Sequence, residues 1–118
     1  MIEREFVIGD VVSWVATLKV DGAALNLTGY TVYLKMSDVE PGGVDLDKNS
    51  TDDTDWLTVT DAAAGQITVT LEDRPSEVPT SGATYIVGRS AVSGSTRHRF
   101  DPEKWTFTVP QEGLYGAI

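Results

Sequence analysis

The sequence predicts an all-β domain, an immunoglobulin-like antiparallel β-sandwich of about seven to eight strands. Apolar and polar residues alternate with a period of two along most of the chain, and no window keeps the spacing of an amphipathic helix for more than a turn. Turn-forming residues interrupt this alternation about every 8 to 12 residues, as in a sandwich. A long polar loop and a proline-containing segment favour a sandwich over a closed barrel, because a meander barrel needs uniformly short turns.

Length and composition set the scale of the protein. The chain has 118 residues, 41% of them hydrophobic, which is enough for one domain to bury a core without disulfides. We expect the sandwich to span residues 1–110 and a carboxy-terminal tail to follow at 111–118. The absence of cysteine excludes a disulfide framework, a thiolate metal site and a cysteine nucleophile, and fits a reducing cytoplasm. The amino terminus has neither the basic start nor the apolar stretch of a secretion signal, so we expect none.

The chain is strongly acidic, with 18 acidic and 9 basic residues and a formal charge of −9. Such a charge repels nucleic acid phosphates and anionic lipid, so we expect no nucleic acid and no membrane partner. No apolar run in the sequence approaches the roughly 20 residues that a membrane-spanning helix needs. The acidity is typical of a β-rich protein that stays soluble and keeps its strand edges from pairing.

Three strands are expected in the first third of the chain, at residues 3–8, 11–20 and 30–37. Glycine takes positive φ at little cost, so glycine-containing pairs between these segments predict turns. These pairs are Gly9-Asp10, Asp21-Gly22 and Thr28-Gly29. The second and third strands are each apolar on one face and polar on the other, which predicts half-buried strands. The inward residues are Val12, Trp14, Ala16, Leu18 and Val20, and then Val32, Leu34 and Met36.

The β pattern resumes after a long polar segment. Residues 38–55 are rich in Asp, Gly, Ser and Thr, and we expect a long loop there with room for one short edge strand. Residues 72–82 contain two prolines, which lack the amide donor of a central strand, so we expect a crossing between the sheets. Further strands are expected at 56–60, 66–71, 85–92, 96–100 and 105–109, with Ile67, Val69 and Leu71 inward and Trp105, Phe107 and Val109 together on one side.

The sequence carries no recognisable catalytic motif. The single histidine, His98, lies between two arginines on an expected hairpin strand and is interpreted as an exposed strand residue. The chain has no Gly-x-Ser-x-Gly turn and no phosphate-binding Gly-x-x-x-x-Gly-Lys loop. We therefore expect that the protein is not an enzyme and has no catalytic residues and no cofactor.

Two weaker patterns suggest a binding module as an alternative. Asp45, Asp47 and Asn49 match the opening of a calcium loop, since hard cations prefer clustered oxygen ligands. The match then fails, because Ser50 replaces the turn glycine and Trp56 replaces the closing glutamate, so a solvated loop is the preferred interpretation. The three tryptophans raise the possibility of a sugar-stacking surface. Trp14 and Trp105 are expected in the core, which leaves Trp56 as the candidate for sugar binding.

Two turn motifs mark the first third of the chain. Residues 6–14 read Phe-Val-Ile-Gly-Asp-Val-Val-Ser-Trp, and after the turn at Asp21-Gly22 residues 27–32 read Leu-Thr-Gly-Tyr-Thr-Val. This region resembles the amino-terminal immunoglobulin-like domain of bacteriophage upper baseplate proteins, which also use Gly-Asp before a long strand and Leu-Thr-Gly before the next. Later in the chain the likeness is limited to the pattern of a turn leading into a strand, at Gly65-Gln66-Ile67 and at 82–85.

The resemblance implies a structural protein of a tailed phage or prophage, a tail or baseplate component of the virion made in the bacterial host cytoplasm. Its expected partners are other phage structural proteins, with a homo-oligomer as a further option. Baseplate proteins continue into a long helical, receptor-side region that these 118 residues do not include, so a head-tail or capsid-decoration protein is an alternative expectation. Leu114, Tyr115 and Ile118 lie outside any expected strand, which suggests that the tail docks on a neighbouring subunit.

Overall fold

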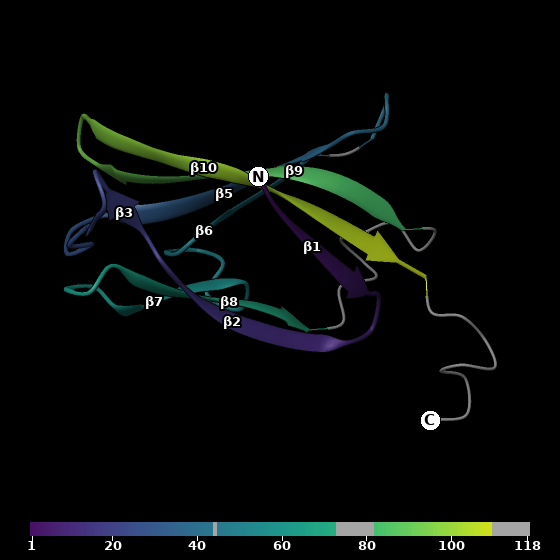
Figure 1. Cartoon of the computed structure of the whole chain (residues 1–118), viewed down its shortest axis with the longest axis horizontal. Helices are drawn as coiled ribbons and strands as arrows, with labels where there is room; N and C mark the ends of the chain where they lie inside the picture. The colour runs from purple at the N-terminus through teal and green to yellow at the C-terminus, as the bar shows by residue number, and fades with distance from the viewer. Residues whose placement is uncertain (44, 73–81, 110–118) are drawn as a thin grey trace.

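The computed structural model describes residues 1–43, 45–72 and 82–109. They form a sandwich of a five-stranded sheet, in the order β1-β10-β9-β5-β6, and a three-stranded sheet, in the order β2-β8-β7, with a small β3-β4 hairpin. Figure 1 shows β9, β10 and β5 in one layer and β2, β7 and β8 in the other. The strands are β1 (Ile2–Val7), β2 (Val11–Thr17), β3 (Lys19–Val20), β4 (Ala23–Ala24), β5 (Thr31–Asp38), β6 (Leu46–Asn49), β7 (Leu57–Asp61), β8 (Gln66–Glu72), β9 (Ala83–Ser93) and β10 (Thr96–Thr108).

The predicted all-β sandwich is confirmed, with more strands than expected. The expected strand at 11–20 is divided at Leu18 into β2 and β3, and β4 and the edge strand β6 are short additions. Among the described strands the pairing is antiparallel except for β1, which runs parallel to β10 from Ile2 opposite Glu103 to Val7 opposite Thr108. The first and last described strands therefore lie side by side.

The two strands expected at 96–100 and 105–109 are one continuous strand, which corrects the prediction. Phe100 pairs with Arg89 and Glu103 pairs with Val87, so Asp101 and Pro102 together face the single residue between them on β9. This is a β-bulge, where a proline without an amide donor is tolerated inside a strand. The extra residue also reverses the alternation, so that Phe100 and Glu103 both face inward.

The core lies between the two sheets and matches the alternation read from the sequence. The inward residues predicted for β5 and β8 are all at most 3% exposed. Phe6 packs on Trp14 with ring centroids 5.5 Å apart, and Trp14 meets Trp105 edge to face at 5.4 Å, so aromatic contacts join β1, β2 and β10. One predicted member is wrong: Val109 is 49% exposed, because it lies beyond the end of β10.

The turn between β7 and β8 fixes the β3-β4 hairpin against the three-stranded sheet. Gly65 has a φ of +67°, and its carbonyl accepts a hydrogen bond of 2.8 Å from the amide of Leu18. A Cβ at this position would lie 2.7 Å from the carbonyl oxygen of Leu25 and 2.9 Å from that of Leu18. Both contacts are with backbone atoms, which cannot rotate away.

We expect Gly65→Ala to lower the free energy of unfolding by about 3 kcal/mol. Alanine would be strained in the left-handed backbone conformation, and its Cβ would be too close to the two carbonyl oxygens. Gly94→Ala is the matched control, because Gly94 also has positive φ but a Cβ there meets nothing within 4 Å. We expect the control to cost about 1 kcal/mol from backbone strain alone. Urea unfolding of both variants measures the difference, and equal losses would contradict the steric account.

Two expectations fall outside the described residues. The proposed crossing at 72–82 lies largely in residues 73–81, and the proposed tail at 111–118 lies in 110–118. The expected loop at 38–55 is described except for residue 44, and it does contain one short edge strand, β6.

Candidate interaction surface

A hollow of about 490 Å³ opens over the five-stranded sheet. Gly88 and Ser90, from the central strand β9, lie between Arg99 on β10 and Tyr33 on β5. The burial alternation of these strands turns all of these residues away from the core, so the hollow lies on the outer face. It forms because glycine and serine add little volume above the middle of the sheet, whereas their neighbours on both sides are large.

The hollow is basic although the chain is acidic. Lys35, Arg97 and Arg99 are outward-facing cations along it, and Asp47 is the carboxylate among its lining residues. Arg97 and Arg99 take part in none of the ion pairs found among the described residues. Guanidinium groups suit carboxylates because they can donate two parallel hydrogen bonds. Tyrosine and arginine are also enriched at the energetic centres of protein interfaces, so this face is suited to binding another protein.

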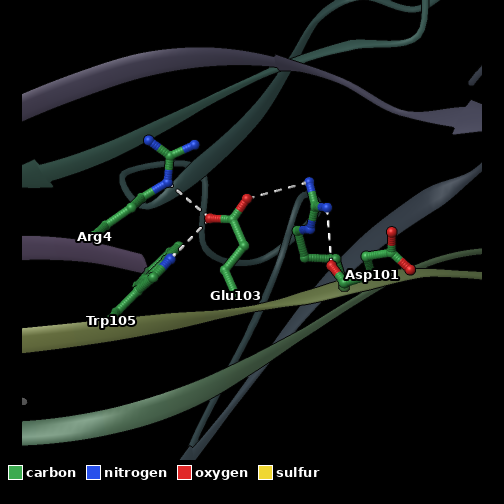
Figure 2. Close-up of polar contacts among 5 residues, drawn as sticks. Arg4, Asp101, Glu103 and Trp105 are labelled. Carbon is green, nitrogen blue, oxygen red and sulfur yellow. Dashed lines mark hydrogen bonds and ion pairs between the residues drawn. The ribbon is translucent and has the colours of Figure 1, made fainter. Parts of the chain in front are cut away.

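On the inner side of the same sheet a carboxylate is buried between two arginines. Glu103, only 3% exposed, follows the bulge in β10. As Figure 2 shows, its Oε1 accepts hydrogen bonds from Arg4 Nε at 2.8 Å and from Trp105 Nε1 at 3.0 Å. Its Oε2 lies 3.7 Å from Arg89 Nη1, and Arg89 Nη2 donates to the carbonyl of Asp101 at 3.0 Å. The cluster therefore joins β1, β9 and β10 at the bulge.

The electrostatics keep Glu103 ionised. Burial alone raises the pKa of the Glu103 carboxyl, but the hydrogen bonds from Arg4 and Trp105 and the positive charge of Arg89 outweigh it, so the pKa lies below its ordinary value. Arg4 in turn lies over the Trp14 ring, with its guanidinium carbon 4.5 Å from the ring centroid. Glu103 therefore stays ionised near neutral pH and loses its charge only in acid.

The calcium-loop candidates do not converge on a common point. Asp47 and Asn49 lie on the extended strand β6, opposite Lys35 and Tyr33, and Asp45 accepts a hydrogen bond of 3.1 Å from the amide of Asp38. Residues spaced along a strand point in parallel rather than around an ion, as a calcium loop requires. Among the described residues, no group of three or more His, Cys, Asp or Glu side chains is placed to hold a metal ion.

Two further sequence interpretations are corrected. Trp56 is 1% exposed and belongs to the core, so its ring offers no open face for stacking a sugar. His98 is half-buried rather than exposed, because it faces inward opposite Ala91, and its ring centroid lies 5.8 Å from that of Tyr30. Over the part of the chain that the structure describes, no helix has the length and apolarity needed to cross a membrane.

Comparison with known proteins gives a match in structure but not in sequence. No protein-family model matches the chain, and no curated protein matches it. Among solved structures, the N-terminal domain of phage TP901-1 ORF48 matches with a TM-score of 0.50 and 12% sequence identity. The match covers 94% of this chain and 85% of that one. The expected resemblance to an amino-terminal domain of a phage protein is confirmed at the level of the fold.

Sequence reasoning missed both the basic hollow and the buried cluster. Arg97 and Arg99 alternate with His98, a pattern that places the two arginines on one face and could have identified a basic patch. Glu103 gave no such signal, because the sequence around Pro102 has the polar character of a loop. Its burial depends on Arg4, which pairing across the sheet brings from the other end of the chain.

Proposed function

We propose that this protein is a non-enzymatic structural component of a tailed phage or prophage particle, placed in the tail or baseplate. It would act through assembly surfaces that contact other phage structural proteins. The observation that carries the proposal is the fold likeness to a phage protein domain over 94% of the chain. At 12% identity that likeness describes the fold, and the role is our inference from it.

Two features of the chain support this proposal. The turns at Gly9 and at Gly29 both have positive φ, as the Gly-Asp and Leu-Thr-Gly motifs of the upper baseplate family imply, so the motifs that carry the resemblance form turns between strands. The candidate surface is an open, charged hollow in a sheet face, bordered by tyrosine and arginine. Such a surface is suited to contacts between proteins. The tail at 111–118 is proposed as a second point of docking.

The test is to locate the protein in purified particles of the phage or induced prophage that encodes it. We expect antibodies against the full chain to label the end of the tail in electron micrographs, and mass spectrometry to find the protein in the particles. Labelling of the capsid instead would replace the baseplate placement by a capsid-decoration role. A protein found in the lysate but absent from washed particles would overturn the structural proposal.

A further inference from the structure

The outer face of the five-stranded sheet carries opposite charges on its two sides. Arg97 and Arg99 project from β10, whereas Asp47 projects from β6. Asp52 adds a second carboxylate on the β6 side, because its Oδ2 accepts a hydrogen bond of 3.2 Å from the Asn49 side chain. Lys35, on β5 opposite Asp47, is a third cation nearer the middle of the face. The β10 side thus carries two cations and the β6 side carries two anions.

The strand register fixes how these charges are spaced. Arg99 lies opposite Ser90, Ser90 lies opposite Tyr33, and Tyr33 lies opposite Asn49, in one row across four strands. Adjacent strands are about 4.8 Å apart, so the ends of this row are separated by about 14 Å. Arg97 lies in the row on one side of it, opposite Val92, and Asp47 lies in the row on the other side, opposite Lys35.

The middle of this face holds a projection and a hollow next to each other. The Tyr33 side chain is 41% exposed and stands on β5. Beside it on β9 are Ser90 and Gly88, and a Cβ added at Gly88 would find only the backbone oxygen of Lys35, at 3.9 Å. The face thus projects on the β5 side of its middle and is hollow on the β9 side, just as it is acidic towards β6 and basic towards β10.

We propose that a second copy of this chain docks on this face, related by a twofold axis parallel to the strands. Such an axis places β10 of each copy over β6 of the other, and β9 of each over β5 of the other. Arg99 then lies diagonally across from Asp47 of the second copy, one row away, and Arg97 lies near Asp52, which follows Thr51 beside Thr31 in the Arg97 row. Each Tyr33 ring enters the hollow above Gly88 and Ser90 of the other copy. Every contact is made twice, as in an isologous dimer.

The charge pattern distinguishes this arrangement from the alternative twofold packing. An axis across the strands would place β10 over β10, so that Arg97 and Arg99 faced their own counterparts with unfavourable like-charge contacts. Each copy also carries a charge of −9, which opposes association at long range. At about 0.15 M salt this repulsion is screened beyond roughly 8 Å, whereas ion pairs in contact are screened less. The dimer is argued from the charges and shape of this face and does not use the fold likeness to a phage protein, so the phage role could fail while the dimer holds.

Analytical ultracentrifugation of the full chain at about 0.15 M salt, over a range of concentrations, tests the proposal. We expect a monomer-dimer equilibrium that Arg99→Glu weakens at least tenfold, with Asp47→Arg acting in the same direction. The double variant Arg99→Glu/Asp47→Arg has the original net charge, with the positive and negative side chains of the contact swapped. We therefore expect it to recover most of the affinity. Lys19→Glu changes an exposed lysine on β3 that does not line the hollow, and it is the matched control that leaves the equilibrium unchanged within twofold.

Three outcomes would overturn the proposal. The first is a chain that stays monomeric at all concentrations, and the second is a dimer that Arg99→Glu does not weaken. The third is a monomer that binds a poly-glutamate peptide through Arg97 and Arg99, which would assign this face to an acidic segment of another protein. Circular dichroism and the melting temperature of each variant check that it is folded, so that loss of the dimer is not loss of the structure.

Discussion

Glu103→Gln is expected to lower the free energy of unfolding by about 3 kcal/mol at neutral pH. Removing one member of a buried ion pair leaves the opposite charge without compensation, which typically costs 3–5 kcal/mol. Arg89, with 14% of its side chain exposed, bears most of this cost, whereas Arg4 at 29% regains some contact with water. Urea unfolding at about pH 7 measures the loss. Glu3→Gln is the control, because the Glu3–Lys104 pair is exposed and should contribute less than about 1 kcal/mol.

The same variant makes a prediction about pH. Glu103 has a pKa below its ordinary value in the folded state, so its ionisation stabilises the fold fully above the unfolded pKa of about 4.5. This contribution is lost as the pH falls through the folded pKa. The stability gap between the natural chain and Glu103→Gln should therefore be constant from about pH 7 to 5 and should narrow below about pH 4.5. A gap that stays the same down to about pH 2 would contradict the electrostatic account.

Trp56→Ala is expected to cost about 3–5 kcal/mol, the usual range when a fully buried tryptophan is removed from a core. The ring is 1% exposed, and its backbone is held by hydrogen bonds to Asp53 and from Thr70, both 2.9 Å long. Because total stabilities of domains are about 5–15 kcal/mol, a loss of this size removes a large part of the margin. Thermal and urea unfolding measure it.

Val15→Ala provides the comparison for Trp56→Ala. Val15 is 60% exposed on the outer face of the three-stranded sheet, so its truncation should change stability by no more than about 0.5 kcal/mol. A Trp56→Ala variant as stable as Val15→Ala would contradict the buried position of the ring. It would also reopen the sugar-binding interpretation of Trp56.

The fold class could be predicted because local alternation reports which face of a strand is buried. The predicted inward residues of β5 and β8 are all buried, and the turn at Asp21-Gly22 forms with φ values of 52° and 80°. The continuity of β10 could not be predicted in the same way. Asp101-Pro102 has the composition of a loop, and only the pairing of the flanking residues with β9 shows that it is a bulge.

The candidate surface was less predictable than the fold, because its residues come from four strands. Tyr33, Asp47, Ser90 and Arg99 are spread over 67 positions in the sequence and become neighbours only through the sheet order. Trp56 was misread for a related reason. It follows a polar segment, which suggested exposure, but the chain enters the core at that residue.

The pairing of β1 with β10 has a consequence for how the chain folds. Arg4 and Glu103 are 99 residues apart, so the contacts that hold β1 form only when almost the whole described chain is available. Contacts between such distant residues slow folding, because the cost of closing a long loop comes before the contacts are gained. During synthesis β1 therefore has no partner strand until β10 has left the ribosome. In the meantime the edge of β1 lacks the partner strand that it has in the folded protein, and an unpaired strand edge is a site where another chain can pair.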